Sequence, residues 1–258
     1  MTNRPLILLT NDDGFFSKGL NSLIEVVSEF GDLIIVAPDK HMSGMSHAIT
    51  LEKKIYINKL SDNPELKKYS CSGTPVDCVK LALDKLSHKR PDFCFSGINH
   101  GSNTSINTIY SGTVAAALEA YINKVPSIAF SLLDYSLDAD FDASKIICRN
   151  IINKFLSVKY DKSISLNVNI PNIKIDDIKG IKLCRQANSG WKEDFEENID
   201  DNGKKYFIMK GFFFNNDKSN DTDEFAIANN FVSVVPLKTD FTDSSNYKSL
   251  QEIFNEEL

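Results

Sequence analysis

The sequence predicts a three-layer α/β fold with a mostly parallel sheet and a C-terminal extension rich in β-hairpins. From residue 5 to about residue 156, short apolar runs of strand length alternate with segments of helical periodicity. Strands separated by helices of this length imply parallel crossovers, with helices covering both faces of the sheet. After Pro171 the pattern changes to apolar runs separated by polar loops, which is typical of hairpins.

Each element of the first half has its own signal. Four short apolar runs predict strands at residues 5–10, 33–37, 92–96 and 127–132. Apolar residues three and four positions apart, or an alanine-rich run, predict helices at residues 17–30, 75–86, 112–122 and 142–155. The helix at 75–86 has the clearest start, because Thr74 suits the N-cap and Pro75 the first helical position. This order of elements is typical of a Rossmann-like sheet.

The second half is expected to hold strands at residues 181–184, 204–209 with 212–214, and 231–236, and a helical tail at 244–254. We treat residues 1–258 as a single domain. In it, residues 1–160 form the α/β core that carries the site. Residues 161–258 form a β-rich extension and C-terminal helix in oligomer contacts.

Composition excludes several classes of protein. The chain has 258 residues, 42% of them hydrophobic and 25% charged, as in folded water-soluble proteins. Its net charge is -6 without a long basic stretch, so we expect neither a nucleic-acid polymer nor a membrane as partner. The five cysteines form no CxxC pair, and no apolar run has the length of a signal-peptide core or membrane span. We therefore expect a cytoplasmic protein.

The strongest chemical signal is Thr10-Asn11-Asp12-Asp13-Gly14, at the carboxyl end of the first strand. In open α/β sheets, ligands bind at this edge, where the strand order reverses. Two adjacent carboxylates repel each other unless a cation is present, and oxygen ligands suit Mg²⁺, Mn²⁺ or Ca²⁺. At this point an ordinary Asn/Asp/Gly turn explains the same residues equally well.

Three more polar clusters end strands or begin helices in the same half: residues 39–46, 96–103 and 110–113. The last of them opens the alanine-rich helix, whose free backbone N–H groups suit an anion such as phosphate. If the fold is as predicted, all of these clusters converge on one edge of the sheet.

In their order along the chain, these segments resemble the motifs of the SurE survival protein family. Five segments carry the resemblance: Asn11-Asp12-Asp13-Gly14, Ala37-Pro38-Asp39 with Ser43-Gly44-x-Ser46, Gly73-Thr74-Pro75-x-Asp77-Cys78-Val79, Ser96-Gly97-Ile98-Asn99-x-Gly101-x-Asn103, and Tyr110-Ser111-Gly112-Thr113-Val114-Ala115-Ala116-Ala117. The resemblance is dense over residues 6–119 and looser in the second half, where Asn167-Val-Asn169-Ile-Pro171 is one match.

The resemblance implies a cytoplasmic, metal-dependent phosphatase of nucleoside 5'- and 3'-monophosphates. It implies one divalent cation per subunit, Mg²⁺ or Mn²⁺, held by Asp12, Asp13, Ser43 and Asn99. It also implies a homodimer or homotetramer whose C-terminal segments exchange between subunits. Substrate contacts are expected from Asn11, Gly44, Ser46, Asn103, Ser111, Gly112 and Thr113. The chain departs from the family pattern at Lys40-His41-Met42 and at residues 104–109, which leaves substrate preference open.

The catalytic residues are expected to be Asp12 and Asp13. A water molecule activated by the metal and by one of these aspartates would attack the phosphorus, while Ser111, Thr113 and the nearby N–H groups neutralise the phosphoryl oxygens. Direct attack by an aspartate is the alternative. A phosphatase for other phosphate esters or short polyphosphate, and a non-catalytic nucleotide sensor, are the alternative functions.

Four further features have two interpretations each. Asp138-x-Asp140-x-Asp142 resembles the start of an EF-hand loop, but it lacks the later Gly and Glu and predicts a helix entry. His41 and His100 lie in the site loops, where they could contact phosphate or protonate the leaving oxygen. For Trp191 we prefer a buried anchor to a lid over the site. Residues 212–214 predict a strand buried at a subunit contact rather than a base-stacking surface.

Overall fold

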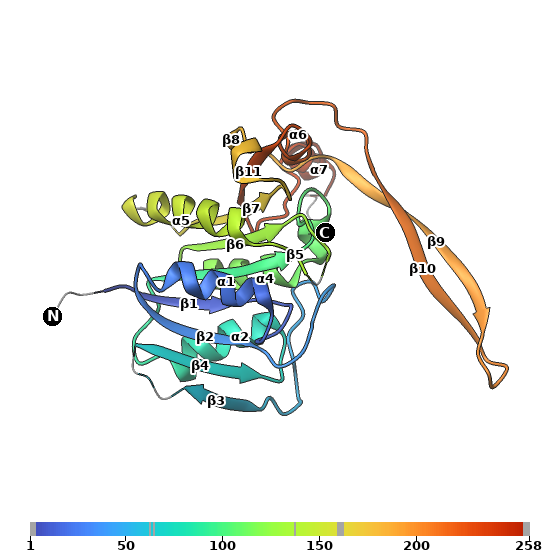
Figure 1. Ribbon diagram of the computed structural model, residues 1–258. Helices are drawn as coiled ribbons and strands as arrows, with labels where there is room; N and C mark the ends of the chain where they lie inside the picture. Colours follow the sequence, from blue (N-terminus) through green and yellow to red (C-terminus); the bar gives the residue numbers. More distant parts are fainter. Residues whose placement is uncertain (1–3, 62, 64, 137, 159–162, 255–258) are drawn as a thin grey trace.

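A nine-stranded sheet runs through the body of the protein, in the order β3-β4-β2-β1-β5-β6-β7-β11-β8 (Figure 1). The computed structural model describes residues 4–61, 63, 65–136, 138–158 and 163–254. The strands of this sheet are β1 (Leu6–Thr10), β2 (Asp32–Pro38), β3 (Ile57–Ser61), β4 (Leu66–Cys71), β5 (Phe93–His100), β6 (Ser127–Leu132), β7 (Ser165–Ile170), β8 (Gly180–Leu183) and β11 (Phe231–Leu237). The β3–β4 and β7–β11 pairs are antiparallel, and the other neighbours in the sheet are parallel.

Helices cover both faces of the sheet, as predicted (Figure 1). On one face lie α1 (Lys18–Val27) and α5 (Asp142–Ser157), which share a hydrophobic core with Ile7 and Leu9 of β1. On the other lie α2 (Pro75–Leu81) and α4 (Gly112–Ile122), which pack on Leu6 and Leu8. Because β1 is buried on both faces, it reads as a continuous apolar run.

The strands and helices predicted for the first half are all present, with three main changes of length. The helix predicted at 17–30 is α1, which ends at Val27. The predicted helix at 75–86 is α-helical to Leu81 and continues as a π-helical turn, Ala82–Leu86. Its start has the predicted cap: the Thr74 hydroxyl accepts from the N–H of Asp77 at 3.1 Å, and the Asp77 carboxylate accepts from the N–H of Thr74 at 2.9 Å. Strand β5 is longer than predicted and extends to His100, so Asn99 belongs to the strand.

The acidic segment at residues 138–142 enters a helix, as predicted. Asp142 lies in the first turn of α5, and its N–H donates to Asp140 Oδ1 at 2.9 Å.

The sequence did not predict β3, β4, β7 or β9 (Ser189–Ile199). Residues 193–203 were expected to be a polar loop, but residues 193–199 belong to β9, which is largely exposed and so has no apolar pattern. Lysine side chains interrupt the apolar pattern of β3 and β4, and β3 is an edge strand that is largely exposed. Strand β7 contains Asn167 and Asn169 at fully buried positions. Buried asparagines break an apolar pattern but are tolerated where their amides find hydrogen-bond partners.

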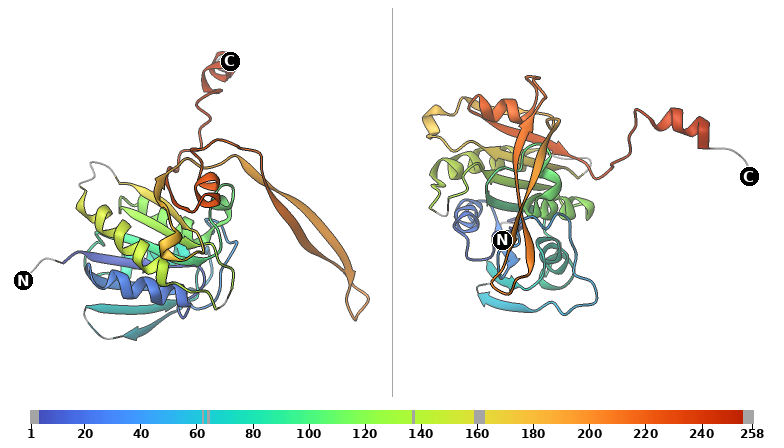
Figure 2. Two further views of the ribbon diagram at one scale, coloured as in Figure 1. Left: turned by 45° about the horizontal axis from the view of Figure 1, so that its top comes forward. Right: turned by 90° about the vertical axis from the view of Figure 1, so that its right-hand side faces the viewer.

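The C-terminal part is more closely joined to the core than the predicted division at residue 160 suggests. Strands β7, β11 and β8 extend the main sheet beyond β6. Between β8 and β11 the chain leaves the body as a long antiparallel hairpin of β9 (Ser189–Ile199) and β10 (Lys205–Asn215), shown in Figures 1 and 2. After α6 (Asp223–Ala228) and β11, an arm carries the predicted tail helix α7 (Tyr247–Phe254) away from the body (Figure 2).

The five cysteines are buried free thiols. Within the described ranges, none of the helices is both long enough and apolar enough to span a bilayer.

Candidate active site

The strand order reverses at β1, which has β2 on one side and β5 on the other. At the carboxyl ends of these strands lies a cavity of about 300 Å³ whose walls include Asp12, Ser43 and Asn99. Asp12 follows β1, Ser43 lies in the loop after β2, and Asn99 is the penultimate residue of β5. The predicted convergence of these clusters on one sheet edge is therefore observed. This edge is where α/β sheets bind ligands.

Asp12 is almost completely buried, with 3% of its surface exposed. Its Oδ1 accepts a hydrogen bond from the Thr113 hydroxyl, and its backbone carbonyl accepts one from the N–H of Met42 at 2.7 Å. Burial, reinforced by the charge of Asp13, raises the pKa of Asp12 to about 6, although the hydrogen bond from Thr113 acts in the opposite direction. Such a carboxylate is stabilised when a cation binds beside it.

Asp13 faces the two histidines of the site loops. Its Oδ2 accepts from the backbone N–H of His100 at 3.1 Å, and its Oδ1 lies 3.4 Å from His41 Nδ1. Burial raises the pKa of Asp13, and the His100 hydrogen bond limits the rise. His100 lines the cavity, whereas neither Asp13 nor His41 is among the described residues that form its wall.

The architecture of β5 orients Asn99. The pairing of β5 with β6 shifts register between Ser96 and Asn99, and such irregularities re-aim a side chain. The amide nitrogen of Asn99 donates to the carbonyls of His100 and Gly101, at 3.1 and 3.0 Å. Because the nitrogen is engaged in this way, Oδ1 is the atom left to bind a cation. Thr113 Oγ1 lies 3.5 Å from it.

The donor set fits a hard divalent cation. Asp12, Ser43 and Asn99 offer a carboxylate, a hydroxyl and an amide oxygen around one cavity, and oxygen donors suit Mg²⁺ or Mn²⁺. In the part of the chain that the structure describes, no three His, Cys, Asp or Glu side chains form a metal-binding group. A cation here would therefore depend on the hydroxyl and amide oxygens, and on water, as well as on the carboxylates.

The N-terminus of α4 meets Asp12. Ser111 is the N-cap, accepts from the N–H of Val114 at 3.0 Å and lines the cavity. Gly112 lies so close to Asp12 that only a residue without Cβ fits there. Thr113 is fully buried, and its hydroxyl donates a hydrogen bond to Asp12. Thr113 is not part of the described cavity wall. Thr113 therefore orients the aspartate. In this geometry the Thr113 hydroxyl contacts Asp12, where a contact with the substrate was expected.

The other expected substrate residues divide into two groups. Gly44 and Asn103 line the cavity. Asn11 does not: its amide nitrogen donates to Gly14 O at 3.0 Å and to Ser17 Oγ at 2.8 Å, which holds the start of α1, and its Oδ1 is buried with no partner among the described atoms. Ser46 donates to Ile109 O at 2.7 Å and ties its loop to α3 (Asn107–Tyr110). In this structure both side chains hold the protein chain in place.

A set of buried amides supports Asn103. Its N–H donates to Asn169 Oδ1 at 2.8 Å, its side chain donates to Ser131 Oγ at 2.7 Å, and its carbonyl accepts from Asn167 Nδ2 at 2.8 Å. In the sequence, Asn167 and Asn169 belong only to a loose motif match. Their spacing of two residues places both on one side of β7, which is the signal that could have identified them.

The expectation that Trp191 is a buried anchor is wrong. Trp191 is 40% exposed and lines the cavity. Tyr110 and Tyr135, neither of which was among the expected site residues, line it as well. The indole N–H of Trp191 donates to Asn107 Oδ1 at 2.8 Å. The alternative interpretation, a lid element over the site, agrees with this position.

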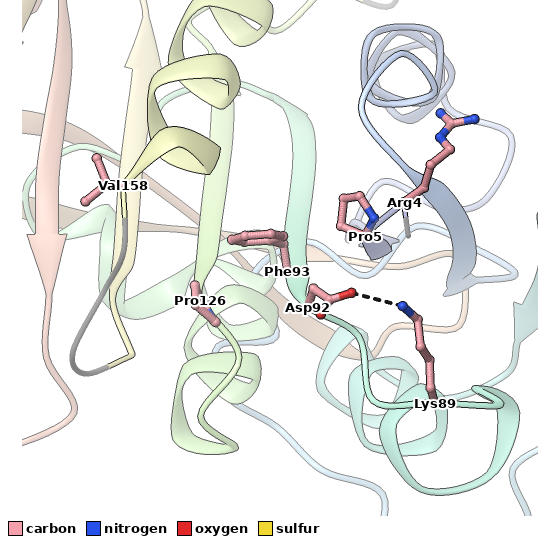
Figure 3. Close-up of a pocket in the computed structure, with 7 residues that line it drawn as sticks. All are labelled: Arg4, Pro5, Lys89, Asp92, Phe93, Pro126 and Val158. Carbon is pink, nitrogen blue, oxygen red and sulfur yellow. Dashed lines mark hydrogen bonds and ion pairs between the residues drawn. The ribbon is translucent and has the colours of Figure 1, made fainter. Parts of the chain in front are cut away.

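A separate hollow of about 340 Å³ lies beside the amino ends of β1 and β5 (Figure 3). Asp92 borders it and is already engaged: Oδ2 lies 3.3 Å from Lys89 Nζ and accepts from the N–H of Leu6 at 2.8 Å. None of the predicted site residues lines this hollow. The candidate active site is therefore the cavity at the carboxyl edge.

The fold and this cavity define an α/β protein with an acidic, oxygen-rich ligand site at the reversal of strand order. The sequence profile of the family described as survival protein SurE matches residues 7–193. The chain belongs to the SurE family.

Known relatives agree with this assignment over nearly the whole chain. The chain is 50% identical over 241 residues to the 5'-nucleotidase SurE of Flavobacterium psychrophilum, which covers 93% of this chain and 94% of that protein. It is 49% identical, over 93% of each chain, to the 5'-nucleotidase SurE of Christiangramia forsetii. Its structure matches the crystal structure of the SurE protein from Aquifex aeolicus with a TM-score of 0.82 and 37% identity, over 96% of this chain and 99% of that one. The predicted family and α/β fold are thus confirmed.

Proposed function

We propose that the protein is a metal-dependent 5'-nucleotidase that hydrolyses nucleoside 5'-monophosphates, and also 3'-monophosphates, to a nucleoside and phosphate. The observation that carries the proposal is the pair Asp12 and Asp13 at the reversal of strand order, with Asp12 facing Ser43 and Asn99 across one cavity. The relatives named 5'-nucleotidase SurE support the same activity.

In this proposal Asp12, Asp13, Ser43 and Asn99 hold one divalent cation, Mg²⁺ or Mn²⁺. When bound, such a cation neutralises charge on the phosphoryl group and lowers the pKa of water. The raised pKa of Asp12, caused first by its burial, supports the assignment, because an uncompensated buried carboxylate has a high affinity for a cation.

The chain's own groups bind and orient the substrate. Asp12, held by a hydrogen bond from the Thr113 hydroxyl, acts as the general base that takes the proton of the attacking water. The N–H groups at the start of α4, beside Ser111, neutralise the phosphoryl oxygens. Attack by an aspartate itself is the alternative, and a phosphorylated aspartate detected by mass spectrometry would establish it.

The test measures phosphate release from AMP with Mg²⁺ or Mn²⁺, and then with excess EDTA. We expect release that requires metal and is lost in Asp13→Asn. The matched control is Asp142→Asn, which removes an exposed carboxylate paired with Lys145 outside the site. Binding of AMP without any release would instead indicate a sensor, and metal-independent release would contradict the proposed site. A panel of phosphate esters and short polyphosphates then defines the substrate range.

We also propose that the protein forms a homodimer or homotetramer. On α7, Tyr247, Leu250, Ile253 and Phe254 are exposed at the end of an arm that leaves the body (Figure 2). Contiguous exposed apolar residues favour association. An apolar cavity of about 850 Å³ beside α4 and β11, whose walls include Leu118, Ile122 and Leu237, has the chemistry to receive α7 of a second copy. Light scattering should show that Leu250→Glu with Ile253→Glu lowers the mass of the assembly.

The free, buried state of the five cysteines supports the proposal of a cytoplasmic location, because reducing compartments keep thiols free. Alkylation of the protein in freshly denatured cells should label each of these cysteines. Disulfide-linked cysteines in that experiment would contradict a reducing compartment.

A further inference from the structure

A second cavity of about 570 Å³ adjoins the one that contains Asp12. The two share three lining residues, Gly44, Tyr110 and Trp191. The outer cavity is further lined by residues from the middle of the hairpin: Glu193, Met209, Lys210 and Gly211. One cleft therefore leads outward from Asp12, between Tyr110 and Trp191, to the hairpin. Each cavity is within the size range of ligand pockets, roughly 300–1,000 Å³.

We propose that the outer cavity is the nucleobase subsite, in which the base of the nucleotide stacks on Trp191 and Tyr110. The inference rests on the proposed function, because it presumes that the phosphate binds beside Asp12 and the start of α4. It extends that function by assigning recognition of the base to two aromatic side chains and the hairpin.

Trp191 is held in place and yet remains accessible. Its indole N–H donates to Asn107 Oδ1 at 2.8 Å, and its ring packs edge-on against Phe213, with centroids 5.7 Å apart and an angle of 66° between the planes. Despite both contacts, 40% of the residue is exposed. An aromatic ring that is already ordered loses little conformational entropy when a base stacks on it.

Tyr110 combines a fixed backbone with an accessible side chain. Its carbonyl accepts from the N–H of Ser46 at 3.0 Å, and the neighbouring carbonyl of Ile109 accepts from Ser46 Oγ. The residue is 52% exposed and lines both cavities. Tyr110 directly precedes Ser111, the N-cap of α4. A phosphate at the first turn of α4 is thus one residue along the chain from this ring.

The charges of the outer cavity favour a base over a chain of phosphates. Glu193 contributes a carboxylate, and the ammonium group of Lys210 is paired with Glu196. A polyphosphate would meet an acid and an already neutralised cation there. A base offers hydrogen-bond donors and acceptors that either group can bind. Its ring can stack on an aromatic side chain whichever of the bases it is.

The first experiment uses the fact that Trp191 is the single tryptophan of the chain, so intrinsic tryptophan fluorescence reports on this position alone. The full-length protein in EDTA is titrated with adenosine, AMP and ribose 5-phosphate. We expect adenosine and AMP to quench the emission and ribose 5-phosphate to leave it unaltered. Equal quenching by ribose 5-phosphate, or no change with AMP that equilibrium dialysis shows to be bound, would overturn the proposal.

The second experiment compares turnover of AMP with that of ribose 5-phosphate, which lacks the base. Trp191→Ala and Tyr110→Ala should lower kcat/KM for AMP by about 10-fold or more, mainly through KM, and lower it far less for ribose 5-phosphate. Tyr110→Phe keeps the ring and should restore AMP turnover. The control, Phe207→Ala, removes an exposed aromatic side chain of the same hairpin that lines neither cavity.

The outcomes separate the two proposals. If the wild type releases phosphate from AMP but Trp191→Ala lowers turnover of AMP and ribose 5-phosphate equally, the base subsite is wrong and the nucleotidase stands. If the wild type hydrolyses neither compound, the nucleotidase is wrong, and the fluorescence titration still decides whether a base binds at Trp191.

Discussion

Gly112 lies so close to Asp12 that a Cβ atom added to the glycine would be 2.9 Å from the Cβ of Asp12 and 3.0 Å from one of its carboxylate oxygens. The first turn of α4 therefore begins directly against the buried carboxylate. Helix N-termini carry a partial positive charge, so this arrangement stabilises the charged form of Asp12, which burial destabilises. The arrangement depends on the absence of a side chain at residue 112.

Gly112→Ala should displace either Asp12 or the start of α4. We expect phosphate release from AMP to fall by at least about 10-fold, because a misplacement near 1 Å is costly in an active site. Forcing an extra carbon into a packed site also destabilises a protein by about 1–3 kcal/mol. AMP turnover and thermal unfolding measure the two effects. Unaltered turnover would show that the position of Asp12 does not depend on this close approach.

Thr113→Val keeps the shape of the side chain and removes the hydroxyl proton that Asp12 accepts. That hydrogen bond favours the charged form of Asp12, so its loss should raise the pKa of the carboxyl further. The acidic limb of the pH profile of kcat/KM should move to higher pH, by about one unit for a hydrogen bond to a charged group. Thr113→Ser keeps the hydroxyl and serves as the control. An unmoved acidic limb would contradict the role given to Thr113.

Protons and the cation should compete for Asp12. Burial raises its pKa from 3.8 to about 6, so Asp12 destabilises the metal-free protein above pH 6. This destabilisation fades as the pH falls from about 6 towards 3.8, where the carboxyl is protonated in both the folded and the unfolded state. The rise in Tm caused by Mg²⁺ should therefore be larger at neutral pH than below pH 6. In Asp12→Asn this difference should shrink, and an undiminished one would assign the titration to another group.

Glu119 should anchor the loop that carries Ser43. Its buried carboxylate lies 3.0 Å from His47 Nε2 and 2.7 Å from Lys80 Nζ. Burial alone would raise the pKa of Glu119, but the hydrogen bonds from His47 and Lys80 outweigh it and lower the pKa. The stabilisation is thus present above the ordinary pKa of glutamate and is lost as the pH falls through the lowered value.

Glu119→Gln should lower the free energy of unfolding at neutral pH by about 1–3 kcal/mol, because it weakens charge-assisted hydrogen bonds to a buried group. Denaturation in urea measures the change. Glu29→Gln, which removes an exposed ion pair with Arg149, is the matched control and should have a smaller effect. Equal effects of the two variants would contradict the anchoring role.

The elements that could be predicted from the sequence are those whose buried positions are apolar. Strand β1 and helix α1 were predicted because their buried positions are apolar with a clear period. Strand β3 was missed because an edge strand with lysine at its centre has no such pattern. Strand β7 was missed for the opposite reason: Asn167 is fully buried, and its stability depends on partners elsewhere in the chain.

The site shows the same division. The polar residues that follow the central strands could be predicted from the sequence: Asp12 and Asp13 after β1, Ser43 after β2 and Asn99 after the apolar run that begins β5. An apolar run and the polar cluster that follows it are local features of a chain. The folded structure was needed to show that the Thr113 hydroxyl is directed at Asp12 and that Trp191 lines the cavity. Asp12 and Thr113 are 101 residues apart, so no local pattern encodes their contact. A side chain's role is set by the atoms that folding brings to it.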